Sequence, residues 1–129
     1  MIFHTFNSSE QRRDFGGSAF IEMQFCKLPS KAAIDQIVAV SSITNWQDDS
    51  LYIHDIEKFE EDYGNIFDCG IYNNLKNGIV DLYGINYYKP DMIKTIVTKI
   101  LEDKPTDYEI LLEWLSKAKS CNGFYILGI

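Results

Sequence analysis

Apolar residues recur along this chain at two spacings, and each spacing predicts a different kind of element. Between residues 19 and 26, Ile21, Met23 and Phe25 alternate with polar residues, which is the pattern of a strand with one face toward a core. Residues 124–129 are almost continuously apolar and predict a last strand. Shorter apolar runs predict a strand or an apolar lead-in at residues 2–6 and a brief strand at residues 51–53, with a loop or one helical turn at residues 7–17 between them.

Helical spacing predicts four further segments. Pro29 and a capping Ser30 open a helix up to about residue 38, and residues 56–63 form a short helix closed by Gly64. Amphipathic spacing is clearest after Pro90, up to residue 101, because proline suits the first turn of a helix. A second long helix is predicted at residues 106–118, opened by a capping box from Thr106 to Glu109 and ended by Asn122-Gly123.

Asn77-Gly78 predicts the turn of a hairpin, because both residues accept a positive φ. Its arms are expected at residues 66–76 and 79–88. Together these elements predict one α+β domain over residues 1–129, with a mostly antiparallel sheet and helices packed on one face.

The length of 129 residues and a hydrophobic content of 46% are typical of a single folded domain with a substantial core. The first residues lack the basic and long apolar regions of a signal peptide, and no window approaches the ~18 apolar residues that span a bilayer. We therefore expect a cytoplasmic protein that does not enter a membrane. The sequence indicates nothing about its oligomeric state.

One short stretch accounts for the formal net charge of −7. Residues 46–70 contain eight carboxylates and one lysine, whereas acids and bases balance in the rest of the chain. A concentrated negative field flanked by aromatic residues suits a positively charged protein partner. Nucleic acid is not an expected partner, because its phosphates would be repelled.

No catalytic or metal-binding motif competes with this feature. Asp48, Asp49, His54 and Asp55 offer metal ligands, but they lack EF-hand spacing and do not form an HExxH helix. No glycine-rich phosphate loop or nucleophile signature is present. We therefore expect no catalysis, no metal and no cofactor, with a small enzyme that uses His54 and neighbouring carboxylates as the least favoured alternative.

Two stretches, DDSLYIHDIEKFEEDYGNIFDCG at residues 48–70 and IVDLYGINYYKPDMIKTIVTKIL at residues 79–101, give the chain a layout that resembles bacterial immunity proteins. These include the immunity partners of contact-dependent growth inhibition toxins. The resemblance implies a cytoplasmic inhibitor that binds a cognate toxin domain, often a nuclease with a basic cleft. An acidic adaptor domain of a larger assembly is the alternative.

In the favoured mechanism, carboxylates occupy the basic site of the toxin as its substrate phosphates do, and aromatic side chains supply contact area. The residues expected to steer and pair with lysine and arginine are Asp48, Asp49, Glu57, Glu60, Glu61 and Asp62. Those expected to anchor the partner are Trp46, Tyr52 and Tyr63.

Cys26, Cys69 and Cys121 are odd in number and widely spaced, which favours free thiols over a disulfide framework. Alkylation of freshly isolated protein in denaturant, followed by mass analysis, should therefore find three modified cysteines. A protected pair would contradict this prediction.

Overall fold

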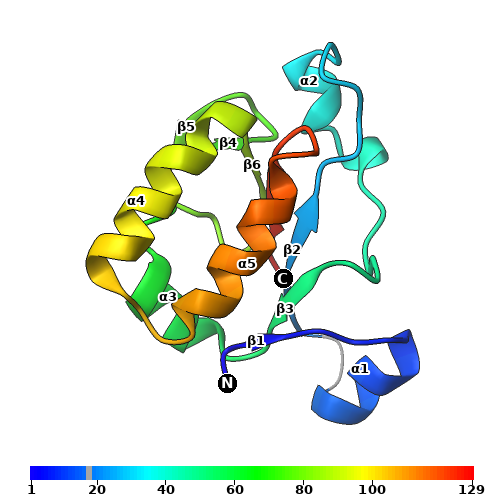
Figure 1. Cartoon of the computed structure of the whole chain (residues 1–129). Coiled ribbons are helices and arrows are strands. Elements are labelled where there is room, and N and C mark those ends of the chain that lie inside the picture. Colours follow the sequence, from blue (N-terminus) through cyan, green and yellow to red (C-terminus); the bar gives the residue numbers. More distant parts are fainter. Residues whose placement is uncertain (17–18) are drawn as a thin grey trace.

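The computed structural model describes residues 1–16 and 19–129 and contains one seven-stranded sheet (Figure 1). All strand pairs are antiparallel, in the order β1-β3-β2-β7-β6-β4-β5. The strands are β1 (Phe3–His4), β2 (Ile21–Phe25), β3 (Leu51–Ile53), β4 (Gly70–Tyr72), β5 (Asn77–Gly78), β6 (Ile85–Tyr88) and β7 (Phe124–Leu127). The helices are α1 (Ser9–Gly16), α2 (Ile34–Ile37), α3 (Ile56–Tyr63), α4 (Ile93–Asp103) and α5 (Tyr108–Ala118), with single 3₁₀ turns at Val40–Ser42 and Pro90–Met92.

The main core lies between the sheet and the helices α3, α4 and α5. Alternate residues of the central strands, such as Met23, Phe124 and Ile126, point toward these helices and are fully buried. The helices contribute their own apolar stripes, including Phe59 on α3 and Ile96 on α4. The α+β class and the antiparallel sheet predicted from the sequence are confirmed.

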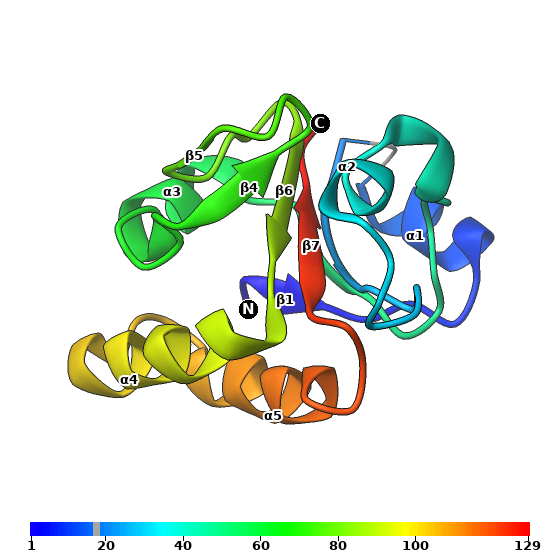
Figure 2. The same ribbon diagram turned by 90° about the horizontal axis from the view of Figure 1, so that it is seen from above.

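A smaller core covers part of the opposite face of the sheet, where α2 packs. The strand register aligns Tyr125 with Gln24 on one side and with Tyr87 on the other. Tyr125 donates a hydrogen bond to the carbonyl of Ile37 in α2 at 2.7 Å. Figure 2 shows α1 and α2 on the opposite side of β7 from α3 and α4. The central strands are therefore buried on both faces.

Several elements match their predicted bounds because local sequence alone specifies them. β3 and α3 occupy the predicted residues, and Pro90 opens the turn that leads into α4. Gly123 has a φ of 79° between α5 and β7, and a Cβ there would lie 2.1 Å from the carbonyl oxygen of Tyr88. A longer helix, α1, forms where the sequence predicted a loop or one turn, with Gly17 of that stretch lying outside the described residues.

The predicted hairpin turn at Asn77-Gly78 is wrong, because these two residues form strand β5 and pair with β4. The turn lies just before them, where Leu75 has a φ of 72°. The Tyr72 amide donates to the Lys76 carbonyl at 2.8 Å, and the Asn74 side chain accepts from the Lys76 amide at 2.9 Å. An asparagine side chain that bonds its neighbouring backbone thus sets the turn earlier.

Two predicted helix starts are also wrong. Asp107, not Thr106, precedes α5, with a φ of 60° and no side-chain bond to the helix. Its carboxylate instead accepts the Ile2 amide at 2.7 Å, which joins the first strand region to α5. α2 begins at Ile34, and its preceding residue Ala33 provides no side-chain cap.

The three cysteines are unbridged thiols. Cys26 is buried, whereas Cys69 and Cys121 are half-buried. Burial and the nearby Asp68 raise the pKa of the Cys69 thiol. In the described residues, no helix combines the length and apolar character needed to cross a membrane.

Substitution of Phe124 tests how much the main core contributes to stability, because its fully buried ring contacts the rings of Phe67, Tyr88 and Trp114. Phe124→Ala should lower the free energy of unfolding by about 3–5 kcal/mol, since a large buried ring leaves a cavity. Denaturant unfolding followed by circular dichroism measures the change. Tyr83→Ala, at a side chain 79% exposed, is the control and should change stability by less than about 0.5 kcal/mol.

Candidate functional site

The acidic segment predicted from the sequence is divided between a loop and a helix. Asp48 and Asp49 lie in the loop before β3, whereas the carboxylates of α3 follow that strand. Strand β3 and the bend at His54 lie between the two groups along the chain. A partner that contacts α3 does not necessarily contact the loop.

The outer face of α3 carries three carboxylates. Glu57, Glu60 and Glu61 are exposed, while Phe59 and Tyr63 on the other face are fully buried. None of the three belongs to an ion pair in the described part of the chain, where the three pairs involve other acids. These carboxylates are therefore available to basic groups of a partner.

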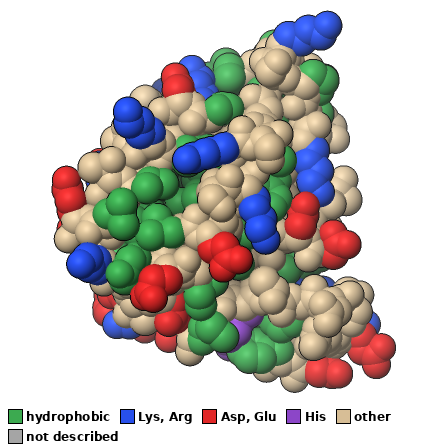
Figure 3. Space-filling model, in the orientation of Figure 1, with side chains coloured by type: hydrophobic (Ala, Val, Ile, Leu, Met, Phe, Trp, Pro, Cys, Tyr) green, Lys and Arg blue, Asp and Glu red, His purple; other side chains and the backbone are tan. Residues whose placement is uncertain are grey.

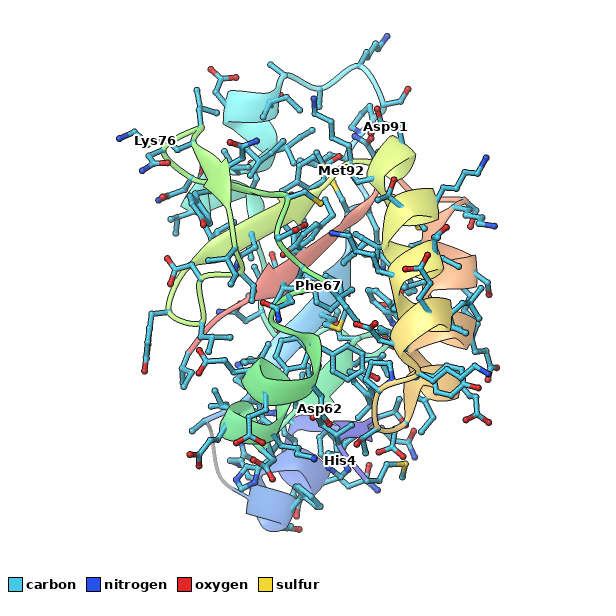
Figure 4. All side chains as sticks on the ribbon, turned by 90° about the vertical axis from the view of Figure 1, so that its left-hand side faces the viewer. His4, Asp62, Phe67, Lys76, Asp91 and Met92 are labelled. Carbon is cyan, nitrogen blue, oxygen red and sulfur yellow. The ribbon has the colours of Figure 1, made fainter. Side chains whose placement is uncertain are left out.

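Asp62 lies at the junction between α3 and the turn from α4 to α5. The Thr106 hydroxyl, followed by Lys58, lowers the pKa of Asp62, and Lys58 lies 3.3 Å from its carboxylate. The Tyr63 hydroxyl donates to the Thr106 carbonyl at 2.7 Å. Figure 4 shows Asp62 between α3 and this turn. These contacts join the last turn of α3 to the turn between α4 and α5 at Thr106.

We call the surface formed by residues 56–63 and 102–109 the acidic pole. It contains eight carboxylates and two lysines, which gives a formal charge of −6 of the −7 of the whole chain. The second segment contributes Glu102, Asp103, Asp107 and Glu109, which lie outside the stretch that the sequence singled out. Figure 3 shows several carboxylates at the lower left of this face, where α3 and the α4–α5 turn lie, and others at its right edge and lower right.

Two of the three expected aromatic anchors lie in the interior. Tyr52 is 3% exposed and Tyr63 is fully buried, so neither ring can contact a partner in this structure. Burial raises the pKa of Tyr52 to about 12. The expectation that these tyrosines anchor a partner is corrected, because both point into packed regions of the fold. Trp46, by contrast, is 38% exposed.

A buried carboxylate, Glu22 of β2, holds the backbone around Trp46. It accepts hydrogen bonds from the amides of Trp46 at 2.8 Å and Gln47 at 3.0 Å. The Ser50 hydroxyl at 2.7 Å and the Gln24 side chain at 3.2 Å add two more. Trp46 has a φ of 69°, which is unusual for a bulky residue and persists only where the surroundings enforce it.

The indole ring of Trp46 joins α1 to the loop. The Arg12 guanidinium carbon lies 3.2 Å from the centre of the ring, and Tyr52 stacks on it at 5.7 Å. Arg12 is only 5% exposed, so its charge is largely removed from water. A desolvated cation over an indole face is a stabilising arrangement, and it fixes the orientation of the ring.

Trp46 belongs to a larger group of rings that we call the aromatic cluster. Its members are linked by centroid distances between 4.4 and 6.4 Å and are His4, Phe6, Phe15, Phe20, Trp46, Tyr52 and His54. Phe15 is 50% exposed. The pKa of His4 is lowered, mainly because its ring is partly buried. Sequence reasoning found only part of this cluster, because its rings come from separate segments.

His54, the residue on which the enzyme alternative depends, lies among aromatic rings. Its ring packs against Phe15 at 5.8 Å and Phe20 at 5.2 Å. The neighbouring Asp55 carboxylate caps α3 by accepting the Lys58 amide at 3.1 Å. No group of three or more metal-binding side chains converges within residues 1–16 and 19–129.

Glu22→Gln should destabilise the loop before β3. A glutamine side chain has nearly the same shape, but its NH₂ group would face donors that the carboxylate now accepts from. At least one buried donor would lose its acceptor, which costs about 2 kcal/mol. Denaturant unfolding measures the loss, and the indole N–H signal of Trp46 should broaden in ¹H–¹⁵N spectra. Glu113→Gln, at an exposed position of α5, is the matched control. An unchanged Trp46 signal would contradict the role assigned to Glu22.

The described surface thus offers two candidate regions, the acidic pole and the aromatic cluster. A comparison of the chain with protein-family models, curated proteins and solved structures found no match.

Proposed function

We propose that this chain is a non-catalytic cytoplasmic inhibitor that binds and neutralises a basic protein, of the kind represented by a nuclease-type toxin domain. The observation that supports the proposal is the acidic pole, in which two acidic segments far apart in sequence are joined through the bond from Tyr63 to Thr106. A field of this density raises the rate at which a basic protein associates. The same field would repel nucleic acid.

The exposure of the α3 carboxylates supports electrostatic binding of a basic partner. Glu57, Glu60 and Glu61 are exposed and outside the ion pairs of the described residues, so pairing with a partner breaks no internal interaction. Asp49 differs, because it pairs with Lys27 at 2.8 Å. Asp49, which the sequence placed with the α3 carboxylates, therefore has a smaller part in the proposed contact.

The aromatic cluster supplies the apolar part of the proposed interface. His54 belongs to the cluster and is two residues from the start of α3, so the two regions adjoin. Trp46 and Phe15 offer exposed ring surface, and tryptophan is enriched among residues that dominate binding energy. The α3 face gives electrostatic steering, and these rings give contact area that slows dissociation.

The first step of the test is to isolate the partner. The chain, immobilised as bait, should capture a basic protein from its source cell, and mass spectrometry identifies it. The activity of the captured protein is then measured with and without the chain. If the chain is an inhibitor, it abolishes that activity in a stoichiometric complex, whereas an adaptor does not. Capture of an acidic partner, or an active stoichiometric complex, would contradict the proposal.

The triple variant Glu57→Gln, Glu60→Gln, Glu61→Gln should associate with that partner about tenfold more slowly at low salt, with little change in dissociation. The matched control is Asp14→Asn, Asp35→Asn, Asp91→Asn, which changes net charge equally at exposed positions elsewhere. Surface-binding kinetics over a range of salt concentrations measure both variants. Equal association rates for the triple variant, the control and the parent would mean that the acidic pole does not steer binding.

Trp46→Ala should change the rate at which the complex with the partner dissociates. Loss of a true anchor should raise the dissociation rate by an amount equivalent to about 2 kcal/mol or more. Circular dichroism must first show that the variant is folded. An unchanged dissociation rate in a folded variant would limit the interface to the acidic pole.

A further inference from the structure

An apolar groove, which we call the α4–α5 groove, lies between the start of α4 and the end of α5. Its volume is about 460 Å³, and it is lined by Pro90, Ile93, Lys94, Val97, Thr98 and Lys119. A volume of this order is typical of sites for small molecules. Figure 2 shows α4 and α5 side by side as the outermost layer on their side of the sheet, so the groove opens to solvent.

The floor of the groove belongs to an apolar stripe along α4. Ile93, Val97 and Leu101 are spaced four residues apart, so they lie on one side of the helix. Ile93 is buried, whereas Val97 is half-buried and Leu101 is 50% exposed. The stripe therefore becomes more accessible along the helix and gives an apolar ligand a surface on which to lie. Removing such surface from water favours binding.

Two exposed lysines flank this floor. Lys94 lies in the first turn of α4, and Lys119 follows the last residue of α5. Neither belongs to an ion pair within residues 1–16 and 19–129. An ammonium group on a flexible, exposed side chain can move to meet a ligand, so both charges are reachable from the groove. Figure 3 shows basic side chains beside the apolar patch over α4 and α5.

The charge around the groove is positive, unlike that of the protein as a whole. The two segments that form the groove, residues 89–98 and 113–121, contain four lysines and two carboxylates, which gives a formal charge of +2. The two carboxylates, Asp91 and Glu113, are not among the lining residues. The groove therefore favours a ligand with an acidic group, which the lysines can pair with directly.

The acidic pole limits such a ligand to one negative charge. The pole begins at Glu102, four residues beyond Thr98, which is about 6 Å along the helix axis. An acidic group near Lys94 meets two lysines, whereas a second one near Leu101 would meet the carboxylates of the pole. The net charge of −7 also repels polyanions such as nucleic acid or an acidic peptide. The groove thus fits one acidic head with an apolar tail.

We propose that the α4–α5 groove is a binding site for a free monocarboxylate with a medium-length alkyl chain, such as octanoate. The carboxylate pairs with the ammonium groups of Lys94 and Lys119, and the chain lies on Val97 and extends toward Leu101. Exposed ion pairs contribute little alone, so the affinity depends on the charge and the apolar contact together. This site lies at the opposite end of α4 from the acidic pole and does not depend on the proposed inhibitory function.

The test is a titration of protein that carries ¹³C-labelled valine methyl groups with sodium octanoate, below the concentration at which octanoate forms micelles and at constant ionic strength. The methyl signals of Val97 report on the groove. Val40, which is 69% exposed and does not line the groove, is the internal control for non-specific adsorption. Octanoate should give a saturable shift of the Val97 signals and leave those of Val40 unchanged.

Three related compounds test the two parts of the ligand. Suberate has the same chain length with a second carboxylate at the far end, and octylammonium reverses the charge of the head. Each should bind at Val97 about fivefold more weakly than octanoate, or less tightly still. Hexanoate should bind about threefold more weakly, because it lacks two methylene groups and an open groove buries only part of each.

Variants separate the groove from a general effect of charge. The double variant Lys94→Gln, Lys119→Gln should weaken octanoate binding about fivefold. The matched control is Arg13→Gln, Lys76→Gln, which removes the same charge at exposed positions outside the groove and should bind like the parent. Val97→Gln should also weaken binding, and circular dichroism must show that this variant is folded. If Val97→Gln does not fold, the two double variants still decide the outcome.

Absence of a saturable Val97 shift in the parent protein up to about 10 mM octanoate, a concentration that detects millimolar affinity, would overturn the proposal. Equal affinities for the double lysine variant and its control would overturn it as well. Binding of suberate or octylammonium as tight as that of octanoate would refute the single acidic head. Equal shifts at Val97 and Val40 would indicate adsorption and count against the site. A Val97 shift that depends on protein concentration without octanoate would mean that a second copy covers the groove, which would also overturn the proposal.

Discussion

The burial of Glu22 is the constraint on which the N-terminal half of the molecule depends. A carboxylate removed from water must be fully hydrogen-bonded, and Glu22 obtains its donors from its own strand and from the loop before β3. That requirement brings the loop down onto the sheet and sets the unusual backbone of Trp46. Trp46 in turn provides the surface against which Arg12 and α1 rest. Glu22 thus fixes the loop by hydrogen bonds, while the rings of the aromatic cluster pack the loop and α1 against the sheet.

The same residue shows where sequence periodicity is misleading. Glu22 and Gln24 alternate with apolar residues, which is the pattern of a strand with a solvated face. The strand is correctly predicted, but both polar side chains are buried, at 3% and 5% exposure. Alternation reports the chemistry of the two faces and not whether solvent reaches them. Only the folded chain shows that the loop and α1 cover this side.

Local sequence patterns predicted most helices and strands, but they could not predict contacts between residues far apart in the sequence. The helices after Asp55 and Pro90 follow from caps and spacing that lie within a few residues. Asp107 was expected to help to open α5, but its carboxylate binds the Ile2 amide from the other end of the sequence. The acidic pole was half predicted for the same reason. The α3 glutamates are contiguous in sequence, but the residues 102–109 beside them join only through tertiary packing.

The position of β7 in the sheet has a consequence for the order of assembly. It is the last strand of the described sequence, yet it lies between β2 and β6 and, among the strands of residues 1–16 and 19–129, it alone joins β1-β3-β2 to β6-β4-β5. During synthesis, the two three-stranded halves therefore emerge with unpaired edges that no earlier segment can satisfy. Such edges are prone to pair with other chains. The nascent chain remains vulnerable to aggregation until residues 124–127 leave the ribosome and close the sheet.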